Sequence, residues 1–136
     1  MYKTIIVPVD LSHAERGKGM IDAAKKLIDK GGGIFLINVV EDMPTYVAAE
    51  LPGGFIDKSK KEAHETLKKM AKEAGLDTEV EVRSGSAHTA ILGFAQEKGT
   101  DLIIIASHHP ELADYLLGST ASRVVRHAKC SVLIIR

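Results

Sequence analysis

Three runs of apolar, mostly β-branched residues limit the folds that this chain can adopt. They are Thr4–Val9, Gly33–Val40 and Leu102–Ala106, and continuous runs of this kind are typical of parallel strands that are covered on both faces. An alternating run follows at Asp77–Arg83, and the last apolar run is Ser131–Arg136. Helical spacing of apolar residues separates all of them. The chain therefore predicts an α/β fold, with right-handed strand–helix–strand units and one open parallel sheet with helices on both faces.

Local signals set the expected ends of the helices. Ser12 and Glu15 match a capping box, and the first helical stripe runs through Ile28 to the glycines at 31–33. A charged helix is predicted over Phe55–Ala74, and another begins after Gly85 and Ser86 and ends at Gly99. The alternation with charges in the fourth run indicates an edge strand with Val80 and Val82 on its inner side.

The longest stretch without periodicity is Glu41–Gly54, which holds two prolines and two glycines. Such stretches are usually functional or mobile. Met43 and Tyr46 are candidates to cover a ligand, but a mobile surface loop is the favoured interpretation.

Composition excludes several classes of protein. The 136 residues suit a single domain, 1–136, and the 18 basic and 18 acidic residues cancel, which argues against nucleic-acid binding driven by bulk charge. A single cysteine, Cys130, cannot form an intramolecular disulfide, and we expect it to be an inert core thiol. No apolar run approaches the length of a membrane span. We expect a soluble cytoplasmic protein with neither nucleic acid nor membrane as partner.

Gly118, Ser119 and Thr120 come directly before a helical stripe whose first turn has no acidic residue. Free N–H groups, hydroxyls and the helix dipole make such a start a potential phosphate site. Either Ser119 or Thr120 is the expected N-cap. The alternative is that this segment is only a turn and a cap.

Asp10 follows the first strand at once. In an open parallel sheet, ligands bind beyond the carboxyl ends of strands, where a carboxylate can accept hydrogen bonds from a ribose hydroxyl or a base amine. The alternative is that Asp10 only caps a turn. Pro8 should lie at the end of its strand, because proline cannot donate to the ladder. His108 and His109 suit an anion better than a metal, since no further ligand stands at metal-binding spacing.

Known catalytic signatures are missing from the sequence. The chain has no Walker-type phosphate loop, no protein kinase signature and no G-x-S-x-G nucleophile elbow. We identify no catalytic residue, although slow hydrolysis of a bound phosphate compound stays open, with Asp10 or His108 as candidates to position metal or water.

Three segments together resemble the universal stress protein family. They are TIIVPVD at Thr4–Asp10, INVV at Ile37–Val40, and the whole of Ile105–Arg136. The resemblance spans essentially the entire chain, and the last segment is most similar to the enterobacterial universal stress protein F subgroup. It implies a Rossmann-like, five-stranded parallel sheet of order 3-2-1-4-5, which agrees with the edge character inferred for Asp77–Arg83.

Many members of this family bind ATP through the motif G-x-x-G-x9-G-[ST]. In this chain Ala106 and His109 occupy the first two glycine positions, and eight residues separate His109 from Gly118. The F subgroup shares this shortened form and is understood to bind ATP. The resemblance therefore implies ATP as the cofactor, with Mg²⁺ as an option. A methyl group at Ala106 requires a negative φ there, and His109 should hold phosphate less firmly than an arginine would.

By position, the resemblance implies that Asp10 contacts adenosine and that the Val39 backbone meets the adenine edge. Ala106, His108 and His109 would surround the ribose and phosphates. The complete implied set of binding residues is Pro8, Val9, Asp10, Val39, Ile105, Ala106, His108, His109, Gly118, Ser119 and Thr120.

The resemblance also implies a homodimer through the exposed last strand, Ser131–Arg136. We therefore expect an ATP-binding stress-response protein that acts as a nucleotide-dependent switch or scaffold and hydrolyses ATP slowly at most. Two alternatives remain at this point: a nucleotide-free homodimeric interaction module, and an enzyme that forms adenylates.

Overall fold

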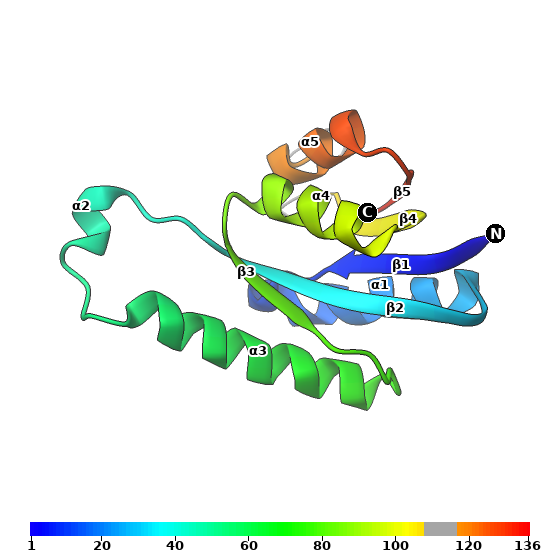
Figure 1. Ribbon diagram of the computed structural model, residues 1–136, viewed down its shortest axis with the longest axis horizontal. Coiled ribbons are helices and arrows are strands. Elements are labelled where there is room, and N and C mark those ends of the chain that lie inside the picture. Colours follow the sequence, from blue (N-terminus) through cyan, green and yellow to red (C-terminus); the bar gives the residue numbers. More distant parts are fainter. Residues whose placement is uncertain (108–116) are drawn as a thin grey trace.

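Five strands build the centre of the protein in the computed structural model, which describes residues 1–107 and 117–136 (Figure 1). The strands are β1 (Tyr2–Pro8), β2 (Ile28–Glu41), β3 (Glu81–Gly85), β4 (Leu102–Ala106) and β5 (Ser131–Ile135). They form one sheet of order β3-β2-β1-β4-β5, and every pairing is parallel. This confirms the predicted α/β fold and strand order, including the edge position of β3.

The helices cover both faces of the sheet. They are α1 (Ala14–Leu27), α2 (Thr45–Ala48), α3 (Phe55–Glu73), α4 (Ala87–Lys98) and α5 (Ser119–His127), and a 3-10 turn, η1 (Leu11–His13), precedes α1. Helices α1 and α3 pack on one face of the sheet, and α4 and α5 pack on the other. In Figure 1, α3 lies below the sheet, α1 lies behind β2, and α4 and α5 lie above. Within the described residues, no helix is both long enough and apolar enough to span a membrane.

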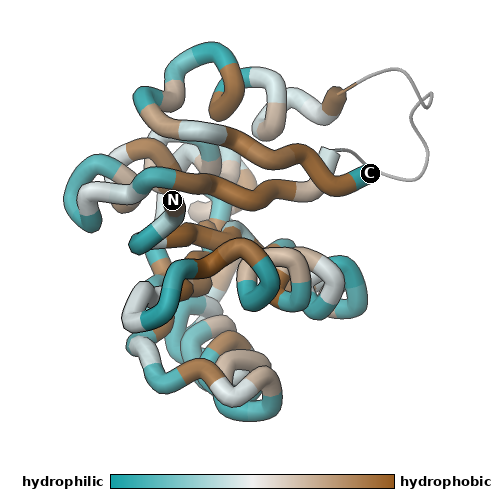
Figure 2. The backbone as a smooth tube through the Cα atoms, turned by 90° about the vertical axis from the view of Figure 1, so that its right-hand side faces the viewer, coloured by the Kyte–Doolittle hydropathy of each residue, from teal (hydrophilic) through white to brown (hydrophobic). Residues whose placement is uncertain are grey.

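Alternation along the central strands divides the core between the two faces. On β1, Ile5 and Val7 pack with α1 and α3, whereas Ile6 packs with α4 and α5, and all three side chains are fully buried. Figure 2 shows the strands as the brown, hydrophobic segments in the middle of the molecule. Burying an isoleucine side chain contributes about 1.5–3 kcal/mol. The β-branched runs found in the sequence therefore dominate the stability of the sheet.

The first helix ends earlier than its glycines predicted. Leu27 is the last residue of α1, and Ile28 already has the extended backbone of β2 (φ −70°, ψ 137°). Tyr2 pairs with Ile28 and Thr4 pairs with Gly33, so β2 bulges at this point. The glycines belong to the strand because pairing with β1 decides the conformation of this segment, which helical spacing alone could not reveal.

The predicted capping box at Ser12 is wrong. The Asp10 carboxylate accepts a hydrogen bond from the Ser12 N–H at 2.9 Å and caps η1, and α1 begins only after His13, without a side-chain cap. Asp10 therefore does cap a turn, as the simpler alternative predicted.

Two further boundaries differ from the sequence predictions. Strand β3 begins at Glu81, four residues later than expected, because Thr78 donates its hydroxyl to the Ile34 carbonyl and the first pair of the ladder is Ile37 with Glu81. Val80 and Val82 do pack on the inner side as predicted. The stretch 41–54 is not wholly irregular, because it contains the one-turn helix α2, which Figure 1 shows at the far end of an excursion from the sheet.

Candidate ligand cleft at the strand ends

A cleft of about 590 Å³ opens where β1 and β4 end. Helix α1 carries the chain from β1 to β2 along one face of the sheet, while α5 carries it from β4 to β5 along the other, so the strand order reverses between β1 and β4. This reversal is where open α/β sheets place ligands. The lining residues are Pro8, Val9, Asp10, Ser12, His13, Arg16, Met20, Ile37, Asn38, Val39, Glu41, Ala87, Ile91, Ile105, Ala106, Ser107, Gly118, Ser119, Thr120 and Ala121.

The structure brings together the predicted binding residues that it describes. They come from four separate segments of the chain, and they are Pro8, Val9, Asp10, Val39, Ile105, Ala106, Gly118, Ser119 and Thr120. The other two predicted residues, His108 and His109, lie outside the described residues. The apolar floor of the cleft comes from strand residues such as Ile37 and Ile105.

Hydrogen bonds hold the chain in place just beyond β1. Pro8 is the last residue of that strand, as predicted. The Val9 N–H donates to the Ile37 carbonyl at 2.8 Å, and the Asn38 side-chain amide donates to the Val9 carbonyl at 2.8 Å. The strand end is therefore tied to β2 on both sides of Val9, and Asp10 leaves it at a defined position.

The start of α5 forms another wall of the cleft. Gly118 is the N-cap residue, with φ −63° and ψ 159°, so the prediction of Ser119 or Thr120 as N-cap is wrong by one or two residues. The Gly118 N–H donates to the carbonyl of Ser107, which follows β4 and is buried. This bond fixes the helix start against the strand end. The first helical bond runs from the Ser122 N–H to the Gly118 carbonyl at 2.9 Å.

Ala106 meets the geometric condition that its methyl group imposes. No non-glycine residue among those described has a positive φ, so Ala106 adopts an ordinary backbone conformation. Alanine in place of glycine at this position therefore introduces no backbone strain.

The sequence reasoning missed several lining residues. His13 is the last residue of η1, Arg16 comes from the first turn of α1, and Asn38 comes from β2. Arg16 and Met20 are four residues apart on α1 and therefore lie on one face of the helix, which is a signal that the sequence did contain. It went unused because Met20 alone was assigned to the hydrophobic stripe.

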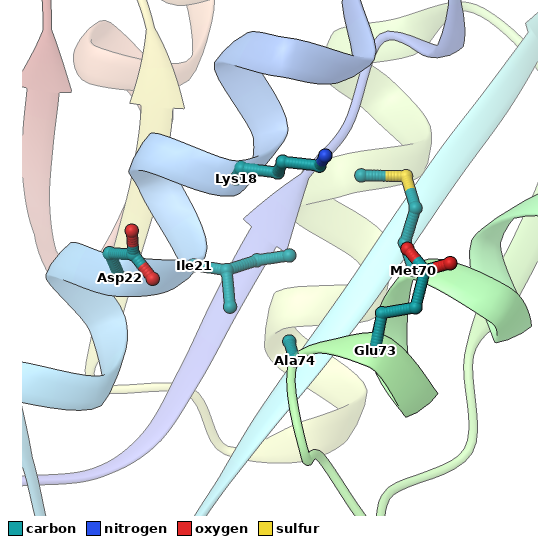
Figure 3. Close-up of a pocket in the computed structure, with 6 residues that line it drawn as sticks. All are labelled: Lys18, Ile21, Asp22, Met70, Glu73 and Ala74. Carbon is teal, nitrogen blue, oxygen red and sulfur yellow. The ribbon is translucent and has the colours of Figure 1, made fainter.

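A second crevice, of about 300 Å³, lies between α1 and α3 (Figure 3). Its residues are Lys18, Ile21, Asp22, Met70, Glu73 and Ala74, and Figure 3 shows the Lys18 side chain reaching toward Met70. It contains none of the predicted binding residues. Across residues 1–107 and 117–136, no three histidine, cysteine or acidic side chains gather as a metal site would require.

Fold and cleft together define an open, doubly wound α/β protein with a cleft at the switch point of its sheet, where such proteins place ligands. The model of the universal stress protein family matches residues 1–136, and the chain belongs to this family. It is 34% identical over 143 residues to universal stress protein G of Escherichia coli O157:H7, with 100% of both chains covered. It is 32% identical over 141 residues to universal stress protein MJ0531 of Methanocaldococcus jannaschii, covering 100% of this chain and 83% of that protein.

Solved structures agree with this assignment. Hypothetical protein MJ0577 superimposes with a TM-score of 0.83 at 26% identity, covering 99% of this chain and 96% of that chain. A universal stress protein in complex with cAMP superimposes with a TM-score of 0.57 at 25% identity, covering 99% of this chain and 97% of that chain.

Proposed function

We propose that this protein is a cytoplasmic stress protein that binds ATP in the cleft between β1, β4 and α5, and that it works as a nucleotide-dependent switch or scaffold. The observation that carries the proposal is the convergence of four distant segments on one cleft that has a helix N-terminus in its wall. The cAMP complex of a structurally similar family member supports an adenine nucleotide as the ligand class.

The chemistry of the cleft fits the parts of ATP. Its volume of about 590 Å³ lies in the range of small-molecule pockets. Val39 and Ile105 offer apolar contact to a base, and the exposed Asp10 carboxylate offers an acceptor for ribose hydroxyls. At the other wall, the N–H groups of Ser119 and Thr120 lie in the first turn of α5, where no intrahelical acceptor exists for them. These N–H groups, together with the two hydroxyls, are the proposed phosphate donors.

The described lining residues favour retention of the nucleotide over fast turnover. They include no lysine, and their two carboxylates, those of Asp10 and Glu41, belong to the ends of β1 and β2 rather than to the α5 wall. If Mg²⁺ accompanies the phosphates, Asp10 is a suitable oxygen ligand, because Mg²⁺ is usually held by one or two carboxylates plus substrate phosphates.

A calorimetric titration with ATP, with and without Mg²⁺, on protein stripped of bound nucleotide tests the proposal. Gly118→Asp places a carboxylate at the N-cap, where it competes with phosphate for the same N–H groups, and the φ of −63° accommodates the side chain. Gly118→Asn is the matched control, because asparagine caps helices equally well without a charge. We expect the Asp variant to lose ATP binding far more than the Asn variant while both stay folded. Stripped wild-type protein that binds no ATP would refute the proposal.

A homodimer through β5 is the second part of the proposal. Strand β5 is an edge of the sheet, and its apolar residues stay half-buried at best. Such an edge invites pairing with a second copy. We expect wild-type protein to elute as a dimer in light-scattering measurements and Ile134→Lys to shift it toward monomer. A monomeric wild type would refute the dimer without touching the nucleotide site.

The enzyme alternative makes its own prediction. An adenylate-forming protein releases pyrophosphate when ATP and a cosubstrate are present, whereas a switch retains the nucleotide. A pyrophosphate assay on protein that binds ATP in the titration distinguishes the two.

A further inference from the structure

Helix α1 contributes a charged side chain to the cleft that the family resemblance did not indicate. Arg16 and Met20 line the cleft from this helix, and His13 lines it from η1, directly before the helix. Among the described lining residues, Arg16 is the one arginine, no lysine is present, and the acids are Asp10 and Glu41. Arg16 is therefore the one described lining side chain with a permanent positive charge. A permanent positive charge and a helix N-terminus that line the same cleft both favour the binding of an anion there.

A close approach of α1 to β1 brings Arg16 to this position. Gly17 is buried, and a Cβ added there would lie 2.9 Å from Met70 Cε and 3.1 Å from Val9 Cγ1. The helix backbone therefore rests directly on the residue that follows β1. Arg16, one residue earlier, is consequently held at the cleft wall.

Two walls of the cleft therefore come from opposite faces of the sheet. Helix α1 lies on the face shared with α3, and α5 lies on the face shared with α4 (Figure 1). Arg16 and the Ser119–Thr120 turn line the same cleft from these two sides. An anion with one phosphate can be satisfied by the α5 turn alone, whereas a chain of phosphates can also engage the guanidinium.

We propose that Arg16 binds the outer phosphates of the nucleotide and makes the cleft selective for nucleoside di- and triphosphates over monophosphates. This inference rests on the proposed function and deepens it by naming the residue that distinguishes nucleotides by the number of their phosphates. A guanidinium makes paired hydrogen bonds to phosphate oxygens, which are stronger than neutral ones. Arg16 thus supplies, from another element, a permanent positive charge in the same cleft as the proposed phosphate donors of α5.

The test measures the affinities of adenosine, AMP, ADP and ATP by calorimetry for wild type, Arg16→Gln and Lys18→Gln. Lys18 is the matched control, because it lies two residues further along α1 in the crevice with α3 and does not line the cleft (Figure 3). We expect Arg16→Gln to weaken ATP by about tenfold or more, ADP less, and AMP or adenosine by less than about twofold. Lys18→Gln should leave all four affinities unchanged, and Arg16→Lys should recover part of the ATP affinity.

The outcomes separate the two proposals. Wild-type protein that binds no nucleotide overturns the proposed function and the role of Arg16 with it. ATP binding that Arg16→Gln leaves unchanged overturns the role of Arg16 alone. An equal loss for adenosine and ATP would make Arg16 a structural residue, and an equal effect of Lys18→Gln would make it one bulk charge among several, so either result also overturns the inference.

Discussion

The carboxylate of Asp101 connects β1 to β4 at the end of the sheet opposite the cleft. Its two oxygens accept hydrogen bonds from the backbone N–H groups of Lys3 at 2.9 Å and Thr4 at 3.0 Å. The β1–β4 ladder itself begins only at Ile5 and Leu102. The side chain therefore extends the pairing of these strands by two residues.

Replacing this carboxylate should cost measurable stability. Asp101→Asn keeps one acceptor and turns an amide toward the other N–H, so one bond to a charged group, worth about 1.5–3 kcal/mol, is lost. The Lys3 N–H is exposed, and water can replace part of the loss. We expect a decrease of about 1–2 kcal/mol in the free energy of unfolding, or roughly 3–7 °C in Tm for a chain of this size.

The stabilisation by Asp101 should depend on pH, and the direction of its pKa shift fixes the direction of this dependence. Burial alone would raise the pKa of Asp101, but the N–H groups of Lys3 and Thr4 outweigh it, and the pKa is lowered. The stabilisation is therefore complete above the unfolded-state pKa of about 3.9 and is lost as the pH falls through the folded-state value. The difference in stability between wild type and Asp101→Asn should be constant near neutral pH and should shrink in acid.

Urea denaturation of wild type and Asp101→Asn at a series of pH values measures this difference. Asp29→Asn is the control, because that carboxylate contacts the exposed N-terminal ammonium at 2.6 Å and should contribute little. A difference that persists unchanged below pH 3, or a loss in Asp29→Asn as large as that in Asp101→Asn, would refute the reasoning.

Three further predictions address other parts of the chain. A Cβ at Gly19 would have no atom within 4 Å, so Gly19→Ala should raise the free energy of unfolding by about 0.5–1 kcal/mol, whereas Gly17→Ala should lower it because the added Cβ is crowded. Urea denaturation measures both changes, and equal shifts would contradict the packing described for α1. The Arg83 guanidinium lies 5.1 Å from the centroid of the Phe94 ring and bonds two carboxylates, so Arg83→Leu should cost about 1 kcal/mol at low salt and less in 1 M NaCl; a loss independent of salt would contradict an electrostatic origin. Burial raises the pKa of the Cys130 thiol, so it should react with a disulfide reagent more slowly than glutathione at pH 8 and equally fast once unfolded; a faster reaction in the native state would contradict this.

The sequence predicted the layers of the fold better than the ends of its elements. Continuous apolar runs identified β1, β2 and β4, because burial on both faces leaves an unmistakable pattern. The end of α1 and the start of β3 were misplaced by several residues. Pairing with neighbouring strands decides both boundaries, and this partner information is absent from local spacing.

In the candidate site too, some residues could be predicted from local sequence and others depended on tertiary contacts. Asp10 and Gly118 could be proposed because strand ends and helix starts can be located in a sequence, and the fold brings such positions together at one end of the sheet. Val39 was implied only by the family resemblance. Arg16 and Asn38 were not found, since nothing in their local sequence shows that α1 rests on Val9 or that an amide reaches the Val9 carbonyl. The half-buried state of Cys130, expected in the core, also depends on β5 being an uncovered edge.

By itself, the sequence determined the class of fold, the order of its elements and the residues available at the strand ends, because the period of the apolar residues and the polar residues that interrupt it are local properties. Only the tertiary structure decided which of those residues share a cleft. Contacts such as that between the Asn38 amide and the Val9 carbonyl, or between Gly17 and Met70, join segments that are distant in the chain. The close packing that sets these contacts is a property of the assembled sheet and its helices.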